Sequence, residues 1–223
     1  IPGGGFRPQV KEKFAAEAQR LAEAGFAAAS ISYRGTPEHG FLDTIHNTKA
    51  AVRFLRANAA RFNIDPDLIG AFGQSAGGHL AGMLAVSGGV ATLEGDGGNT
   101  DVSSRVQAAV TFAGPFDFIS RLGPEGHQRV RLEERRERIG NWLGGPLSEN
   151  NAAWKLGSPY YHVSEDDPPM LLVHCKDDES VPYQQSIQMF DAIKVLRPES
   201  RLLLFEKGGH GIRGSSLVGD EAW

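Results

Sequence analysis

The sequence predicts an α/β protein in which a mostly parallel sheet is flanked by helices. Short apolar runs alternate with amphipathic runs along the chain, as a parallel sheet with crossover helices requires. A glycine-bounded serine turn joins the apolar residues 68–72 to the alanine- and leucine-rich residues 76–86, which predicts a strand, a sharp turn and a helix. Two later apolar runs, residues 169–174 and 201–206, each end in a polar turn. Because α/β sheets bind ligands beyond the carboxyl ends of their strands, these turns are expected to meet at one site.

The other elements are predicted from periodicity and from residues that end helices. In chain order we expect a helix over residues 11–24 that ends at Gly25, a strand over 26–33, a helix over 42–61 with Ala50, Phe54 and Leu55 at core spacing, a strand over 106–113 and a helix over 183–196 before Pro198. No linker rich in Pro, Gly or Ser divides the chain. Residues 1–223 are therefore predicted to form a single domain.

The tightest chemical pattern is Gly73-Gln74-Ser75-Ala76-Gly77, between the expected strand and helix. Glycine is needed two residues before and after the serine, because a Cβ at either place would collide with the neighbouring strand and helix. Such a turn lifts the serine hydroxyl clear of the backbone, above the N-terminus of the helix. The pattern therefore predicts that Ser75 is a nucleophile.

A serine nucleophile requires a base and an acid that orients this base. Asp178 lies in the polar turn after the strand expected over residues 169–174, and His210 lies between glycines after the strand expected over residues 201–206. The chain order Ser75, Asp178, His210 is that of the α/β-hydrolase triad. These three residues are therefore the predicted catalytic residues.

Other candidates for the same roles are present. Asp177 is the alternative acid, and the spacing to Val181-Pro182 favours Asp178. His79 lies on the helix after Ser75 and is expected to pack or cap locally. His174 ends a buried strand, where a hydrogen-bonded core histidine is the default interpretation.

The negative charge of a tetrahedral intermediate requires backbone N–H donors. Ala76 supplies one expected donor, because it follows the nucleophile directly. The others are expected from Gly3-Gly4-Gly5, since three successive glycines let the main chain approach the substrate oxygen closely.

These motifs resemble those of α/β-hydrolase esterases related to hormone-sensitive lipase, acetylxylan esterases and feruloyl esterases. The resemblance implies that the oxyanion hole is formed by Gly4, Gly5 and Ala76. In two places the chain departs from the family pattern, with Pro2 where a histidine usually precedes the glycines and Cys175 where a glycine usually follows the strand histidine. Pro2 is expected to change how the oxyanion loop is braced. The matching residues are 2–6, 31–34, Asp43 with 50–55, 63–66, 73–81, Asp117 after Gly114-Pro115, Asp178 with Val181-Pro182, and His210.

Composition limits the partners and cofactors. The formal net charge of −4 argues against a nucleic-acid or anionic-membrane partner, and the apolar stretches are too short to span a bilayer. Cys175 is the only cysteine, which excludes an internal disulfide. No metal or organic cofactor is expected: Asp96, Asn99 and Asp101 lie in a glycine- and acid-rich loop, 88–101, but lack the ligand spacing of a calcium loop. The expected partner is a small-molecule or oligosaccharide ester, and the sequence indicates neither an oligomeric state nor a compartment.

Residues 116–147 are predicted to form a cap-like insertion over the site. They contain a charged run, residues 128–139, that is expected to be helical. Its inner side is expected to shape the acyl or alcohol pocket through Phe116, Phe118, Ile139 and Trp142. Asp117 is assigned either to substrate contact or to loop orientation.

The start of the chain predicts a gap in the sheet. In the family that the chain resembles, the strand leading into the glycine triplet lies between the strands expected here at residues 27–32 and 68–72. Without that strand, backbone groups in the middle of the sheet are left unpaired. Because the chain begins with Ile1 and not with a methionine, we expect that the natural protein carries further N-terminal residues; the sequence does not indicate whether an export signal is among them.

The predicted function is that of a serine carboxylesterase acting on short-chain acyl or aryl esters. The resemblance extends this to acetyl or feruloyl groups on plant polysaccharides. Two alternatives share the motifs. A peptidase of the prolyl-oligopeptidase type has the same serine turn and triad order but usually carries a large accessory domain. A non-catalytic binding module on this fold often lacks one of the three residues, whereas this chain has all of them.

Overall fold

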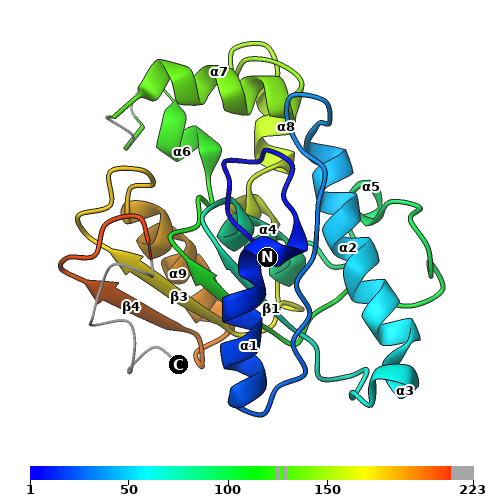
Figure 1. The fold of residues 1–223 in the computed structure, drawn as a ribbon. Helices are drawn as coiled ribbons and strands as arrows, with labels where there is room; N and C mark the ends of the chain where they lie inside the picture. The colour runs from blue at the N-terminus through cyan, green and yellow to red at the C-terminus, as the bar shows by residue number, and fades with distance from the viewer. Residues whose placement is uncertain (124–125, 128–129, 212–223) are drawn as a thin grey trace.

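Four parallel strands form the centre of the fold (Figure 1), seen in a computed structural model that describes residues 1–123, 126–127 and 130–211. The strands lie in the order β1 (Gly70–Gln74), β2 (Ala108–Phe112), β3 (Met170–Cys175) and β4 (Arg201–Phe205). In the parallel register, Gln74 lies opposite Phe112 and Phe112 opposite Val173. The carboxyl ends of the strands therefore meet at one edge of the sheet, and the predicted α/β class is confirmed.

Helices pack on the sheet and also form a group at one end of the molecule. Helices α4 (Ala76–Val86) and α9 (Gln184–Leu196) pack on the sheet, α4 against β1 and β2 and α9 against β3 and β4. Helices α6 to α8 lie together at one end of the molecule (Figure 1). The remaining elements are η1 (Lys11–Phe14), α1 (Ala15–Glu23), α2 (Phe41–Ala57), α3 (Ala59–Phe62), α5 (Ala91–Glu94), α6 (Phe118–Leu122), α7 (Leu132–Leu143), α8 (Asn151–Leu156) and η2 (Pro159–His162).

The core divides into layers on the two sides of the sheet. One large cluster of buried side chains joins β1, β2 and β3 to α4 and α9, and a second joins α2, α4 and the helices α6 to α8. A smaller cluster around Phe112 and Val173 lies on the other side of the sheet. There Phe14 of η1 contacts Phe72, with 5.6 Å between the ring centroids. Burial of both faces explains the continuous apolar composition of β3.

The strand predicted over residues 26–33 does not form. Only Tyr33 pairs, through an isolated antiparallel bridge with Gln9, and the Phe26 side chain is 65% exposed. Beside β1 the terminal amino group of Ile1 donates to the Phe72 carbonyl (2.6 Å). Residues 27–32 pair with no described strand. Since a strand requires such a partner, β propensity alone does not produce one here.

The other predicted elements are displaced by a few residues at their ends. The helix expected over 42–61 is divided into α2 and α3 at Asn58, and Phe54, predicted to be core, is 45% exposed. The charged helix begins at Leu132 instead of residue 128; Gln128 and Arg129 lie outside the described residues. Within the ranges given above, no helix combines the length and hydropathy that crossing a bilayer would need.

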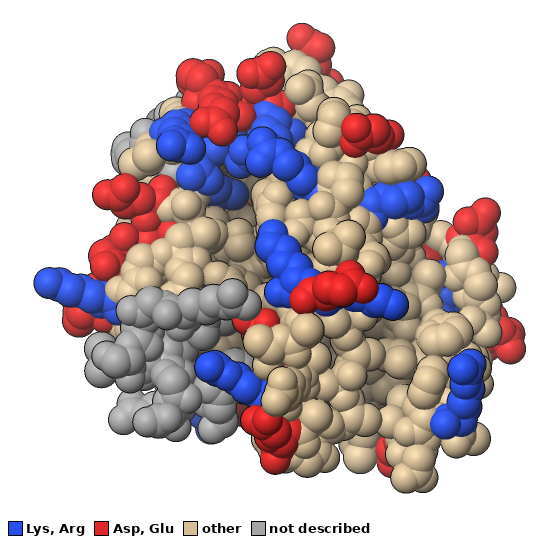
Figure 2. Space-filling view, viewed as in Figure 1, with Lys and Arg blue, Asp and Glu red and all other residues tan. Residues whose placement is uncertain are grey.

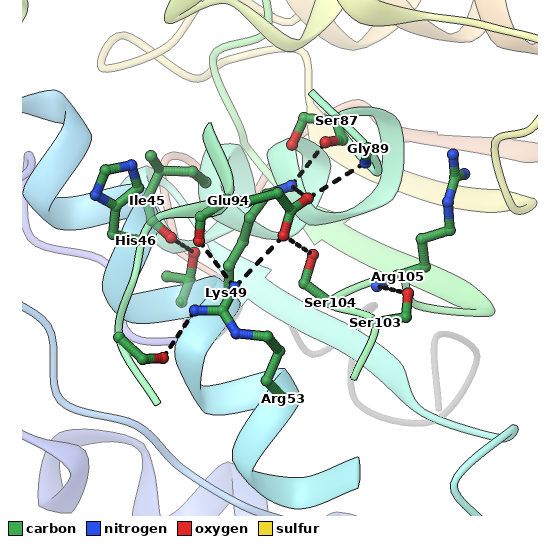
Figure 3. A network of polar contacts seen from close by, with 12 residues as sticks. Ile45, His46, Lys49, Arg53, Ser87, Gly89, Glu94, Ser103, Ser104 and Arg105 are labelled. Atoms are coloured by element: carbon green, nitrogen blue, oxygen red, sulfur yellow. Dashed lines mark hydrogen bonds and ion pairs between the residues drawn. The ribbon is translucent and has the colours of Figure 1, made fainter. Parts of the chain in front are cut away.

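A largely buried ionic network joins α2 to the end of α4 and to α5 (Figure 3). Lys49 Nζ donates to Glu94 Oε1 (2.6 Å) and to the Ser87 carbonyl (2.6 Å), while Arg53 Nη1 donates to the Glu94 carbonyl (2.8 Å). Burial lowers the pKa of Lys49. Burial raises the pKa of Glu94, but hydrogen bonds from Lys49 and Ser104 outweigh this effect and hold the pKa below its ordinary value. The network therefore links α2, the end of α4 and α5 through direct hydrogen bonds.

We expect Glu94→Ala to lower the free energy of unfolding by about 3 kcal/mol, because it leaves the Lys49 ammonium buried without its carboxylate. Urea unfolding monitored by circular dichroism measures this loss. The matched control is Asp191→Ala, which removes an exposed carboxylate paired with Lys194 and should cost less than about 1 kcal/mol. Equal losses in the two variants would contradict a stabilising role for the buried network.

Candidate active site

Ser75 stands at a strained turn between β1 and α4. Its backbone has φ 56° and ψ −120°, a conformation that few non-glycine residues adopt. A Cβ on Gly73 would lie 2.1 Å from the Gly77 carbonyl oxygen, and one on Gly77 would lie 2.1 Å from the Ile1 carbonyl oxygen. The two glycines of the motif are therefore required by contact between backbone segments, as the sequence predicted.

The structure brings Ser75, His210 and Asp178 into one chain of hydrogen bonds. The distance from Ser75 Oγ to His210 Nε2 is 2.8 Å, and that from His210 Nδ1 to Asp178 Oδ2 is also 2.8 Å. The three residues follow β1, β4 and β3, whose carboxyl ends share one edge of the sheet. With Nδ1–H donated to the carboxylate, Nε2 is free to accept the hydroxyl proton of Ser75.

Asp178 is a buried carboxylate with a full set of donors. Its Oδ1 accepts from the backbone N–H groups of Ser180 (2.7 Å) and Val181 (3.0 Å). Burial raises its pKa, but the hydrogen bonds from His174 and His210 outweigh burial, and the net pKa lies well below the ordinary value. Because the folded-state pKa is lowered, this carboxylate stabilises the fold above about pH 4. That stabilisation is lost as the pH falls through the lowered value.

His174 contacts the same carboxylate oxygen of Asp178 as His210 does. Its Nε2 lies 3.2 Å from Asp178 Oδ2 and 3.0 Å from the Val181 carbonyl, and its Nδ1 lies 2.7 Å from Ser186 Oγ. Since both neighbours of Nε2 are acceptors, Nε2 carries the proton and Nδ1 accepts from the Ser186 hydroxyl. The sequence interpretation of a hydrogen-bonded core histidine missed this contact. Its one sequence signal is the position of His174 four residues before Asp178.

Asp177 has a different contact from Asp178. Its carboxylate accepts from the backbone N–H groups of Gly208 (3.3 Å) and Gly209 (2.8 Å), next to His210. Gln74, directly before Ser75, donates from Nε2 to the His210 carbonyl (3.1 Å). The loop that carries His210 is therefore fixed at its backbone by β1 and by the turn after β3.

The glycine triplet lies directly against Ser75. A Cβ on Gly3 would lie 2.7 Å from the Gln74 carbonyl oxygen, and Lys13 Nζ donates to the Gly3 carbonyl (2.9 Å). Gly5 has φ 63°, in the left-handed region that favours glycine. The backbone N–H groups of Gly4, Gly5 and Ala76, the expected oxyanion donors, donate no hydrogen bond to any described residue, and all three residues border the same cavity as Ser75.

Phe6 attaches the glycine triplet to α7. The Phe6 ring stacks on Trp142, with centroids 3.9 Å apart and planes at 20°, and meets the His79 ring edge-on at 5.0 Å. Burial lowers the pKa of His79 to about 3, so its imidazole is neutral, and Nδ1 donates to the Pro115 carbonyl (2.9 Å). His79 therefore packs locally, as expected from the sequence.

The predicted role of the 116–147 segment needs a correction. Of the four apolar residues expected to shape the pocket, Ile139 lines the cavity, whereas Phe116, Phe118 and Trp142 are buried in the core. Phe116 belongs to the apolar cluster that joins the sheet to α4 and α9, and Phe118 and Trp142 belong to the cluster that joins α2, α4 and the helices α6 to α8. Asp117 is also buried and caps α6, accepting from the Ile119 N–H (2.9 Å). Its contacts are those of an orienting residue.

The cavity at Ser75 has a volume of about 420 Å³, within the range of small-molecule sites. Its walls come from the glycine triplet, the end of β1, α1, α6, α7 and the turn after β3. In the described ranges no three His, Cys, Asp or Glu side chains are grouped as metal ligands. The 88–101 loop, which contains Asp96, Asn99 and Asp101, is instead bound by an arginine. Arg53 donates to the carbonyls of Gly97 (2.8 Å) and Gly98 (3.2 Å) in this loop.

The class of the protein follows from this arrangement. α/β-Hydrolases have a serine between a strand and a helix, followed in the chain by an acidic residue and a histidine beyond later strands of a parallel sheet. The chain has the α/β-hydrolase fold. It belongs to the BD-FAE family, whose sequence profile matches residues 1–193. The resemblance inferred from the motifs is thereby confirmed.

Several similar proteins are named as ester hydrolases or as bifunctional enzymes. The chain is 33% identical over 196 residues to the probable carboxylic ester hydrolase LipM of Mycobacterium tuberculosis, covering 87% of this chain and 44% of LipM. It is 28% identical to a bifunctional GH43-CE structure from Bacteroides eggerthii, with a TM-score of 0.85 and coverage of 98% and 32%. An acetyl ester-xyloside bifunctional hydrolase from Caldicellulosiruptor lactoaceticus is 27% identical, with a TM-score of 0.74 and coverage of 95% and 72%. The chain thus spans less than half of LipM.

Proposed function

We propose that this protein is a serine esterase in which Ser75 is the nucleophile, His210 the general base and Asp178 the orienting acid. The observation that carries the proposal is the hydrogen-bonded series from Asp178 to Ser75, at 2.8 Å for each step, at the wall of a cavity. The names of the relatives, carboxylic ester hydrolase and esterase, support the same reaction.

Hydrolysis proceeds in two half-reactions. His210 Nε2 takes the proton of Ser75 as Oγ attacks the ester carbonyl, and Asp178 stabilises the imidazolium that forms. The N–H groups of Gly4, Gly5 and Ala76 stabilise the oxyanion. The imidazolium then protonates the leaving alcohol, which departs as the acyl-enzyme forms. Water, deprotonated by the same imidazole, attacks the acyl-enzyme and releases the carboxylic acid and the free serine.

We propose short acyl esters on carbohydrates as the substrate class. The cavity of about 420 Å³ is sufficient for a small acyl group with part of a sugar. Two structural relatives carry names that combine an esterase with a glycoside-hydrolase or xyloside activity. Acetyl and feruloyl groups on plant polysaccharides are therefore the leading substrates within this class.

A substrate panel tests the proposal. We expect hydrolysis of 4-nitrophenyl acetate, acetylated xylan or methyl ferulate, and no hydrolysis of peptide 4-nitroanilides. A fluorophosphonate probe should label the protein, and mass spectrometry of the digested adduct should place the label on Ser75. Failure of both labelling and ester hydrolysis would favour the binding-module alternative, whereas cleavage of the anilides would favour a peptidase.

A further inference from the structure

The cavity at Ser75 is strongly cationic, although the chain as a whole has a net charge of −4. Five cationic side chains line it, and among the lining residues only Glu17 is a carboxylate. Figure 2 shows Lys and Arg side chains gathered on the α7 side around a hollow in the surface. Hydrolysis of a neutral ester by a serine triad requires none of these charges. The cationic residues of the lining are Arg7, Lys13, Arg121, Arg135 and Arg138.

Arg138, on α7, stands beside the oxyanion loop. Its Nε and Nη2 atoms lie 3.6 and 3.8 Å from the point that a Cβ on Gly5 would occupy. The buried Nε donor has no hydrogen-bond partner among the described residues, and Nη1 has only a long contact, 3.4 Å, with Glu134. Nε is closed to solvent, but the Arg138 side chain as a whole is 22% exposed and lines the cavity, so its terminal nitrogens can meet an acceptor there.

Arg135 and Arg121 continue the cationic surface. Arg135 Nε donates to the Val130 carbonyl (3.2 Å), and no described carboxylate lies within 4.0 Å of the Arg135 guanidinium. Arg121 is buried, and its Nη2 donates to the Ser180 carbonyl (2.9 Å). Burial, together with repulsion from Arg135 and Arg138, lowers the pKa of Arg121 to about 9. An anion in the cavity would relieve this repulsion.

We propose that the cavity selects esters that carry a carboxylate close to the scissile bond, and that Arg138 and Arg135 bind that carboxylate. This inference rests on the proposed esterase function. A guanidinium suits the role because its planar N–H groups match a carboxylate in a bidentate arrangement. Arginine is also less strongly hydrated than lysine, so less solvation is lost when the anion enters.

The carboxylate has two chemical sources. It can belong to the acyl group, as in a half-ester of a dicarboxylic acid, or to the alcohol, as in an acylated acidic sugar. Both present the same anion to the same arginines. Separate substrate pairs distinguish the two sources, because each pair places the charge on only one side of the ester bond.

The experiment compares charged and neutral substrates of closely similar shape. The acyl pair is 4-nitrophenyl hydrogen adipate and its methyl-capped diester. The alcohol pair is 4-acetoxybenzoate and 4-acetoxybenzamide. The kcat/KM ratio of charged to neutral substrate is measured for the wild type, Arg138→Gln, Arg135→Gln and the control Arg61→Gln, which replaces an arginine on α3 outside the cavity lining.

We expect the wild type to prefer the charged member of at least one pair by about tenfold, and the preference to decrease with added salt. Arg138→Gln and Arg135→Gln should each reduce the ratio by about tenfold, whereas Arg61→Gln should keep it. If either cavity variant does not fold, inhibition of the wild type by adipate but not by adipamide provides the same test. A ratio near or below one in both pairs overturns the inference. Absence of hydrolysis of 4-nitrophenyl acetate would instead overturn the proposed function.

Discussion

Ser75→Ala is expected to reduce ester hydrolysis by about 10⁴-fold or more while leaving the fold intact. The substitution removes the Oγ that lies 2.8 Å from His210 Nε2 and retains the backbone turn that joins β1 to α4. Steady-state kinetics with 4-nitrophenyl acetate measure the loss. Circular dichroism and the urea midpoint show whether the variant is folded.

The matched control is Ser87→Ala at the other end of α4. Ser87 is fully buried, whereas Ser75 is half-buried, and the Oγ of Ser87 donates to the Met83 carbonyl, outside the cavity. This variant is expected to lose about 1 kcal/mol of stability and to keep the wild-type rate. If Ser75→Ala retained more than about 1% of the wild-type kcat/KM, Ser75 would not be the nucleophile.

The positions of the three proposed catalytic residues could be predicted because they depend on topology. In a parallel sheet the residues just beyond the carboxyl ends of the strands share one edge, so Ser75, Asp178 and His210 had to be near one another. The choice of Asp178 over Asp177 depends instead on the directions of their side chains. Adjacent residues in a turn point in different directions, and the backbone donors of Ser180 and Val181, together with His174, fix which carboxylate faces His210.

Features that depend on packing could not be predicted. The mixed charges of α7 do not indicate which side of the helix faces the cavity, because that depends on how Trp142 packs against Phe6. The charged run therefore did not indicate that Arg138 lines the cavity. The expected strand over residues 26–33 had the right composition, but a strand needs a partner, and this requirement is not local in sequence.

Asp178→Asn is expected to reduce kcat/KM by about 10³- to 10⁴-fold, through the tautomer of His210. The N–H groups of Ser180 and Val181 donate to Oδ1, so the amide oxygen of the variant takes that position and the NH₂ group replaces Oδ2. The NH₂ group then faces Nδ1 of His210, which must become an acceptor. The proton moves to Nε2, where it prevents the imidazole from accepting the proton of Ser75. Nitrogen NMR of the His210 ring, alongside kinetics, detects this change.

Asp177→Asn distinguishes this effect from a general disturbance of the turn. The Asp177 carboxylate accepts only backbone N–H groups, from Gly208 and Gly209, and an asparagine oxygen can accept the shorter of these bonds equally well. We therefore expect less than a tenfold loss and an unchanged tautomer of His210. The reverse ranking of the two variants would make Asp177 the orienting acid. A similar large loss in both, with the His210 tautomer unchanged, would mean that the aspartates act by holding the histidine loop and not through the charge beside Nδ1.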